Sequence, residues 1–150
     1  MGHTYATNLL HCVFSTKERR NVLSPEIRSR LEPYLAGIAR ANGFKILAGR
    51  AVEDHAHVLL SLPPSLALAK AMQLVKGGSS KWVHDTFPEA RDFGWQDGYG
   101  AFSIGISGLN ATVAYIENQE EHHRKRNFEA EFVAFLKKHG IEYDERYVFG

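Results

Sequence analysis

Cysteine is nearly absent from this chain, which carries only Cys12 among its 150 residues. One thiol cannot form an intramolecular disulfide, so a disulfide-stapled secreted domain is excluded and a reducing, cytoplasmic location is expected. No apolar run reaches the ~18 residues of a membrane-spanning helix, so we expect no membrane association. The N-terminus lacks the basic stretch and small-residue cleavage site of a signal peptide.

An excess of either charge is also lacking, because the net charge is +1. The composition therefore does not by itself indicate a nucleic-acid-binding protein. Positive charge is instead local, in TKERR (16–20), KGGSSK (76–81) and HHRKR (122–126). Each cluster alone is typical of a solvated surface, and the sequence does not show whether they converge. The length and the 44% of apolar residues predict one domain spanning 1–150.

Hydrophobic periodicity predicts four strands and four helices. The strands are expected at 8–15, 44–52, 55–62 and 101–107. The helices are expected from the Ser24 N-cap to Asn42-Gly43, from Ser65 to Thr86, over ATVAYIENQEEHH, and from Asn127 to Gly140. The order β-α-β-β-α-β predicts an α+β, ferredoxin-like fold with an antiparallel sheet, helices on one face and an additional C-terminal helix. That fold hosts many functions, so it does not settle this one.

Two helices contain residues that disfavour a regular helix. Pro33 should kink the first helix or remove one of its hydrogen bonds. Gly77-Gly78 in the second helix indicates either a kink or a place where another backbone, such as a phosphate chain, approaches closely.

His55 and His57 stand two apart at the start of the third strand. Eight histidines in 150 residues give about 0.4 such pairs by chance, so the motif alone is weak evidence. Alternate residues of a strand share a face, so both imidazoles point the same way while Ala56 faces the other layer. Two imidazoles can bind a divalent metal, but a third ligand is needed.

The third helix supplies candidates for the missing ligand. Tyr115 and Gln119 are four residues apart and therefore share a helix face, with His122 close to the same face. Taken singly, each is typical of an amphipathic helix. A tyrosine beside a carboxamide, in a chain that also has a strand-borne H-x-H motif, is a more specific combination.

Together these segments resemble the single-tyrosine HUH transposases of the smallest bacterial insertion sequences and their relatives associated with repetitive extragenic palindromes. The resemblance covers nearly the whole chain, through VFSTKERRNVL, EDHAHVLLSLPP, AMQLVKGGSSKWV, GYGAFSIGIS and VAYIENQEEHH. It implies that Tyr115 is the nucleophile and that His55, His57 and Gln119 bind the metal. It further implies metal-dependent cleavage and rejoining of single-stranded DNA through a 5′-phosphotyrosine, with recognition of hairpins at the element ends. Manganese or magnesium suits this ligand set, although zinc also binds imidazole.

Basic and small polar residues are expected to contact the DNA backbone, namely Lys17, Arg19, Arg20, Lys76, Ser79, Ser80 and Lys81. A homodimer with shared active sites is also expected. The short connection between the fourth strand and the tyrosine helix would keep Tyr115 from folding back over its own histidines, and the compact insertion-sequence members that the chain resembles are dimers. The strand FSIGIS could pair with its own copy at a sheet edge.

Three further interpretations remain open. Asp54 is interpreted first as a turn former, and only second as a residue that orients an imidazole. The chain could be a domesticated, non-catalytic hairpin-binding module on the same fold, or a small metal-dependent hydrolase that uses His55, His57, His122 and His123. A covalent protein–DNA adduct separates these functions, because neither binding nor hydrolysis leaves a protein–DNA bond.

Overall fold

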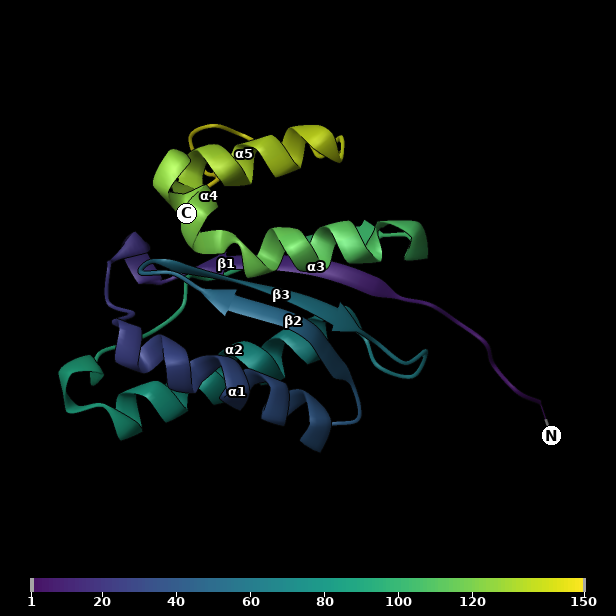
Figure 1. The fold of residues 1–150 in the computed structure, drawn as a ribbon, viewed down its shortest axis with the longest axis horizontal. Coiled ribbons are helices and arrows are strands. Elements are labelled where there is room, and N and C mark those ends of the chain that lie inside the picture. Colours follow the sequence, from purple (N-terminus) through teal and green to yellow (C-terminus); the bar gives the residue numbers. More distant parts are fainter. Residues whose placement is uncertain (1, 150) are drawn as a thin grey trace.

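The computed structural model describes residues 2–149 and contains four strands and five α-helices in that range. Figure 1 shows their arrangement. The strands are β1 (Leu9–Ser15), β2 (Lys45–Ala51), β3 (His55–Ser61) and β4 (Gly100–Ile104). The helices are α1 (Pro25–Ala41), α2 (Leu68–Thr86), α3 (Leu109–Glu117), α4 (Gln119–Lys125) and α5 (Phe128–Lys138).

The four strands form one sheet in the order β2-β3-β1-β4, and every neighbouring pair is antiparallel. With α1 between β1 and β2 and α2 between β3 and β4, this is the β-α-β-β-α-β arrangement that the sequence predicted. β3 lies between two other strands, and six of its seven residues are buried. The predicted fold class is confirmed.

Helices cover both faces of the sheet. α1 and α2 pack on one face, while α3 and α5 lie on the other (Figure 1). The larger core, between the sheet and α1 and α2, includes Phe14, Leu31 and Val75; a smaller one joins Phe102 of β4 to Phe128 and Phe132 of α5. The expectation of helices on one face is therefore incomplete, because the C-terminal helices cover the second face.

The two helices that contain Pro33 and Gly77-Gly78 are both continuous. Ser24 caps α1 by accepting a hydrogen bond from the Ile27 amide, and the helix continues through Pro33. α2 is unbroken through Gly77-Gly78. A Cβ at Gly78 would lie 3.2 Å from Ile38 of α1, so the absence of a side chain lets the two helices pack closely. This favours a packing role for Gly78 over contact with a phosphate chain.

Three expected boundaries are wrong. α2 starts at Leu68, and Ser65 does not cap it. β4 ends at Ile104, because residues 106–108 form a 3-10 turn. The expected third helix is split at Asn118, whose φ of −100° and ψ of 25° are not helical. The Asn118 amide side chain donates a hydrogen bond to the Ala114 carbonyl, which offers the backbone an alternative to a continued helix.

None of the helices within residues 2–149 has both the length and the apolar composition needed to cross a membrane.

Candidate active site

β3 presents His55 and His57 on the sheet face that α3 and α5 cover. The antiparallel register places Ser15 opposite His55 and Val13 opposite His57. Both imidazoles are buried, while Ala56 between them belongs to the core on the opposite face. The sequence-based prediction of a shared face for the two histidines is confirmed.

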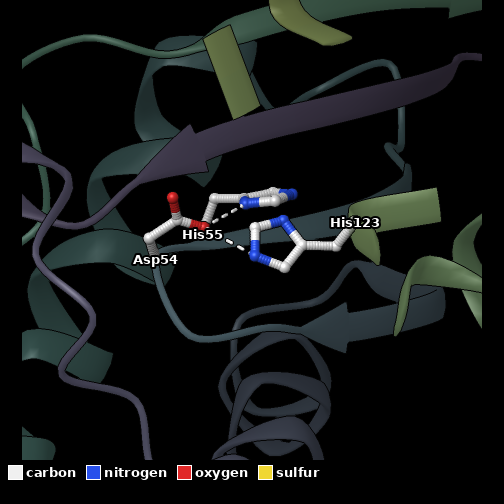
Figure 2. Close-up of side chains that lie close together, drawn as sticks. All are labelled: Asp54, His55 and His123. Carbon is white, nitrogen blue, oxygen red and sulfur yellow. Dashed lines mark hydrogen bonds and ion pairs between the residues drawn. The ribbon is translucent and has the colours of Figure 1, made fainter. Parts of the chain in front are cut away.

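Asp54 holds the imidazole of His55. Its Oδ1 atom lies 2.7 Å from His55 Nδ1, and His123 Nε2 lies 3.9 Å from the same oxygen, as Figure 2 shows. Burial alone lowers the pKa of His55, but the hydrogen bonds with Asp54 and Glu131 outweigh it and raise that pKa to about 9. The preference for Asp54 as a turn former only was wrong, because its carboxylate also orients His55 and leaves Nε2 facing the site.

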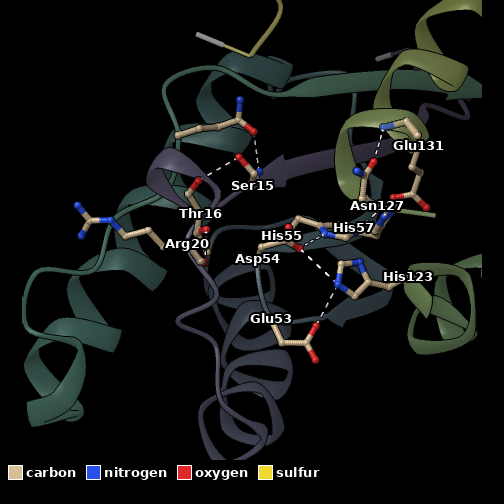
Figure 3. A network of polar contacts seen from close by, with 12 residues as sticks. Ser15, Thr16, Arg20, Glu53, Asp54, His55, His57, His123, Asn127 and Glu131 are labelled. Carbon is tan, nitrogen blue, oxygen red and sulfur yellow. Dashed lines mark hydrogen bonds and ion pairs between the residues drawn. The ribbon is translucent and has the colours of Figure 1, made fainter. Parts of the chain in front are cut away.

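A buried carboxylate, Glu131 of α5, joins the two histidines to Tyr115. Its Oε1 lies 3.0 Å from His57 Nε2 and 3.3 Å from His55 Nε2 (Figure 3). Its other oxygen accepts a hydrogen bond from the Tyr115 hydroxyl. Burial favours the neutral acid, but the hydrogen bonds with His55 and His57 dominate and keep the pKa of Glu131 well below its usual range. Glu131 is therefore an ionised carboxylate at the centre of the cluster.

Sequence reasoning missed Glu131, although α5 contains a signal. The helix has an apolar stripe at Phe128, Phe132, Phe135 and Leu136, and Glu131 falls within that stripe. A carboxylate is almost never buried without partners, so an acid on the apolar face of a helix indicates a buried polar contact.

His11 of β1 was also missed. Its Nε2 lies 2.7 Å from His57 Nδ1, and burial lowers its pKa to about 3, so it is a neutral imidazole. Burial likewise lowers the pKa of His57. The contact fixes the ring of His57 with Nε2 directed to Glu131.

Tyr115 lies over the histidines of its own chain. The centroid of its ring is 5.9 Å from that of His57, and the ring stacks on His122 at 4.3 Å. Burial and the Glu131 carboxylate raise the pKa of Tyr115 to about 12, so its hydroxyl is protonated at neutral pH. The expectation that the short connection after β4 keeps Tyr115 away from its own histidines is wrong for this conformation.

Gln119 is buried beside Tyr115, where its side-chain amide donates to the Tyr115 carbonyl at 3.3 Å. Among residues 2–149, its Oε1 atom has no hydrogen-bond partner. Buried polar atoms normally have such a partner, so this unpaired oxygen indicates a missing ligand. The donor atoms of His55, His57 and Glu131 lie within 4.8 Å of one another, and two imidazoles with a carboxylate are suitable donors for a divalent cation, so these residues fit a metal.

Comparison with known proteins identifies the family. The pattern of the family described as "Transposase IS200 like" matches residues 4–119, about three quarters of the chain. The chain belongs to the IS200-like transposase family.

Relatives and solved structures agree with this assignment. The ISDra2 transposase TnpA of Deinococcus radiodurans is 27% identical, over 80% of this chain and 89% of the relative. The transposase for insertion sequence element IS200 of Salmonella typhimurium is 29% identical, over 81% and 82% of the two chains. A crystal structure of a transposase from Deinococcus radiodurans superimposes with a TM-score of 0.65 at 26% identity, over 79% of this chain and 96% of that one. A tyrosine transposase associated with REP sequences, solved bound to a REP hairpin, shares the fold with a TM-score of 0.59 at 15% identity, over 82% and 73% of the chains.

The family match ends at residue 119, so Glu131 lies beyond it. The matched part of this transposase contains Tyr115, His55, His57 and Gln119. The carboxylate that contacts Tyr115, His55 and His57 comes from α5, beyond the matched residues.

The basic clusters 16–20 and 76–81 meet at the loop 92–98. The Lys17 amide donates to the Gly94 carbonyl, and Arg20 pairs with Asp92. The Lys76 ammonium donates to the carbonyl of Gln96 at 2.7 Å. Since the Thr16 amide donates to the Asp54 carbonyl, this basic surface adjoins the His55 end of the site.

One expected DNA contact is wrong. Ser79 is fully buried, donates its hydroxyl proton to the Val75 carbonyl and accepts a hydrogen bond from Trp95, so its side chain is part of the core. The other six residues have side chains that are at least partly exposed, and they stay a prediction.

Proposed function

We propose that this IS200-like transposase is a metal-dependent strand transferase that cleaves and rejoins single-stranded DNA through a 5′-phosphotyrosine at Tyr115. One observation carries the proposal: the carboxylate that accepts the Tyr115 hydroxyl proton in a hydrogen bond also contacts both imidazoles of the His55–His57 pair. A nucleophile and the donors for a cation thus form one buried cluster, which is the arrangement that phosphoryl transfer requires.

The reaction is a transesterification. The Tyr115 oxygen attacks a backbone phosphorus, the bond from that phosphorus to the 3′ oxygen breaks, and the products are a 5′-phosphotyrosine and a free 3′-hydroxyl. Attack by a second 3′-hydroxyl reverses the step and joins a new strand without ATP, because the phosphodiester is conserved. Glu131 accepts the hydrogen bond of the Tyr115 hydroxyl and would orient the attacking oxygen.

His55, His57, Glu131 and Gln119 would hold the cation, with magnesium or manganese as the proposed metal. A divalent cation neutralises the charge that develops on the phosphate oxygens. The chain itself orients the two imidazole donors, because Asp54 contacts the ring of His55 and His11 contacts the ring of His57.

Hairpin DNA is the proposed substrate. Support comes from the REP-associated tyrosine transposase that shares this fold and was solved with a REP hairpin. The proposed contacts to the DNA backbone are Lys17, Arg19, Arg20, Lys76, Ser80 and Lys81. A protein that acts on DNA in this way would work in the cytoplasm.

The function is tested by trapping the covalent adduct. The protein is incubated with Mn²⁺ and a single-stranded hairpin oligonucleotide labelled at its 3′ end, and the products are separated by denaturing electrophoresis. We expect a labelled band at the mass of the protein plus the downstream fragment. Hairpin binding without this band would indicate a non-catalytic module, and cleavage without it would indicate a hydrolase.

Glu131 should matter more for metal binding than Gln119. We expect Glu131→Gln to weaken Mn²⁺ binding on the order of 10–100-fold, because the charged donor is lost. Gln119→Ala should weaken it less, since a water molecule can replace a neutral amide oxygen. Isothermal titration calorimetry measures both, and Glu129→Gln, which alters an exposed neighbour paired with Arg19, is the matched control. A larger loss for Gln119→Ala would exclude Glu131 as the principal third donor.

A homodimer is proposed through β4, which lies at one edge of the sheet. Because Tyr115 already contacts Glu131 of its own chain, we expect each subunit to use its own residues rather than share sites. Mixing Tyr115→Phe with His57→Ala, under conditions in which labelled subunits demonstrably exchange, should then restore no cleavage. Restored adduct formation would instead establish the shared site that the sequence suggested.

A further inference from the structure

A groove of about 460 Å³ opens beside Tyr115, and Gln119 is not among its lining residues. We name it the α3–α5 groove, because residues of α3 and α5 line it above β1 and β4. Its lining residues are His11, Phe102, Ile104, Ala111, Thr112, Tyr115, Arg126, Ala134, Phe135, Lys138 and His139. A volume of this size accommodates a small organic group such as one nucleotide, not a duplex.

Aromatic rings form one side of the groove. Phe102 stacks on Phe135 with ring centroids 5.2 Å apart and on His139 with centroids 4.9 Å apart. Phe135 is partly exposed and His139 is exposed, so faces of these rings are available to a ligand. Nucleobases of single-stranded DNA bind to such surfaces by stacking.

The charge of the groove suits a phosphate chain. Arg126 and Lys138 line it, neither forms a salt bridge with residues 2–149, and no carboxylate of that range lines it. A second groove of about 450 Å³, beside Gln119, is lined by charges of both signs, namely Glu32, Glu117, Glu120 and Glu121 with Arg28, Arg50 and Arg124. The charged side chains that line the α3–α5 groove are all basic, so a DNA strand that reaches Tyr115 is favoured on that side.

We propose that the α3–α5 groove binds the nucleotide adjoining the scissile phosphate, with its base against Phe135 and His139 and its phosphate at Arg126 and Lys138. The inference rests on the proposed function, since it assumes that Tyr115 attacks single-stranded DNA. It adds a binding site for one unpaired base beside the nucleophile, contributed in part by the C-terminal helix.

The test combines a blocked groove with a missing base. Ala111 is exposed and lines the groove, so Ala111→Trp fills it without disturbing the core. Ala114→Trp, at an exposed α3 position outside the groove, is the matched control. Binding of a hairpin with a single-stranded flank is measured by fluorescence anisotropy in the Tyr115→Phe background, so that no cleavage interferes. The flank is either intact or carries one abasic site, scanned through each position.

In Tyr115→Phe protein with an unblocked groove, we expect an abasic site at one flank position to weaken hairpin binding about tenfold. In protein that also carries Ala111→Trp, the same abasic site should have no effect. Ala114→Trp should retain the tenfold difference. Lys138→Gln should weaken hairpin binding for every flank sequence and lower the salt dependence of the affinity by about one counterion. Lys137→Gln, which changes the neighbouring residue outside the groove, should have neither effect. Equal abasic losses in Ala111→Trp and Ala114→Trp, or no loss at any position, would overturn the proposal.

The same measurements separate the two proposals. If the wild-type protein binds the flanked hairpin but forms no covalent adduct, the proposed function fails while the anisotropy series still decides on the groove. If the adduct forms and no abasic position changes the hairpin affinity, the groove proposal alone fails. Thermal melting of Ala111→Trp checks whether this variant still folds. If Ala111→Trp unfolds, Lys138→Gln still tests the groove, because Lys138 is exposed and its substitution leaves the core unchanged.

Discussion

Tyr115→Phe should abolish the covalent adduct and lower strand cleavage on the order of 10⁴-fold or more, while hairpin affinity stays within about twofold. The substitution removes the attacking oxygen and keeps the ring that stacks on His122. Adduct formation with a labelled hairpin and binding by anisotropy measure the two effects separately. Because Glu131 loses a hydrogen-bond donor, Mn²⁺ affinity is measured in the same variant to separate loss of the nucleophile from loss of the metal.

Tyr99→Phe and Tyr143→Phe are the controls for this prediction. Both rings are partly exposed, and neither contacts Glu131 or the histidine pair among the hydrogen bonds of residues 2–149. Both variants should therefore form the adduct at the wild-type rate. If the adduct persists in Tyr115→Phe, the nucleophile is elsewhere, and these two tyrosines are the next candidates.

Removal of either imidazole should stop the reaction as completely as removal of the nucleophile. We expect His55→Ala and His57→Ala each to weaken Mn²⁺ binding about 100-fold and to abolish the adduct, because each supplies one of the two nitrogen donors. Chelation with EDTA should have the same effect on the wild-type protein. Calorimetry and the adduct assay measure the results, and circular dichroism checks that the fold survives.

His84→Ala is the matched control, since His84 lies on α2 and, among residues 2–149, pairs only with Asp85. It should change neither metal affinity nor adduct formation. Full activity in EDTA, or unchanged metal affinity in the double variant of His55 and His57, would refute the proposed metal site.

Local patterns predicted the parts of the site that depend on local geometry. Strand alternation was enough to place His55 and His57 on one face and Ala56 on the other. Hydrophobic periodicity predicted the order of the strands and helices, and hence the fold. The break at Asn118 was missed because an asparagine inside a helical pattern costs little. Its non-helical backbone angles and its contact with the Ala114 carbonyl are visible only in the structure.

The residues that sequence reasoning missed depend on contacts between distant segments. His11 and His57 are 46 residues apart, and their contact requires the register of β1 against β3. Glu131 and His57 are 74 residues apart, and their contact requires α5 to pack over the sheet. No periodicity within one element encodes either contact. An acid in an apolar helical stripe was the only local sign of Glu131.

The position of Glu131 also bears on where this transposase can be shortened. A chain ended at Gln119, the last residue of the family match, would keep the whole sheet, the histidine pair and Tyr115. It would lose α5, and with it the cover over Phe102 and the carboxylate between the two imidazoles. On the proposed function, we therefore expect a chain cut at the end of the family match to bind Mn²⁺ more weakly and to lose adduct formation, because that boundary separates Glu131 from the histidine pair.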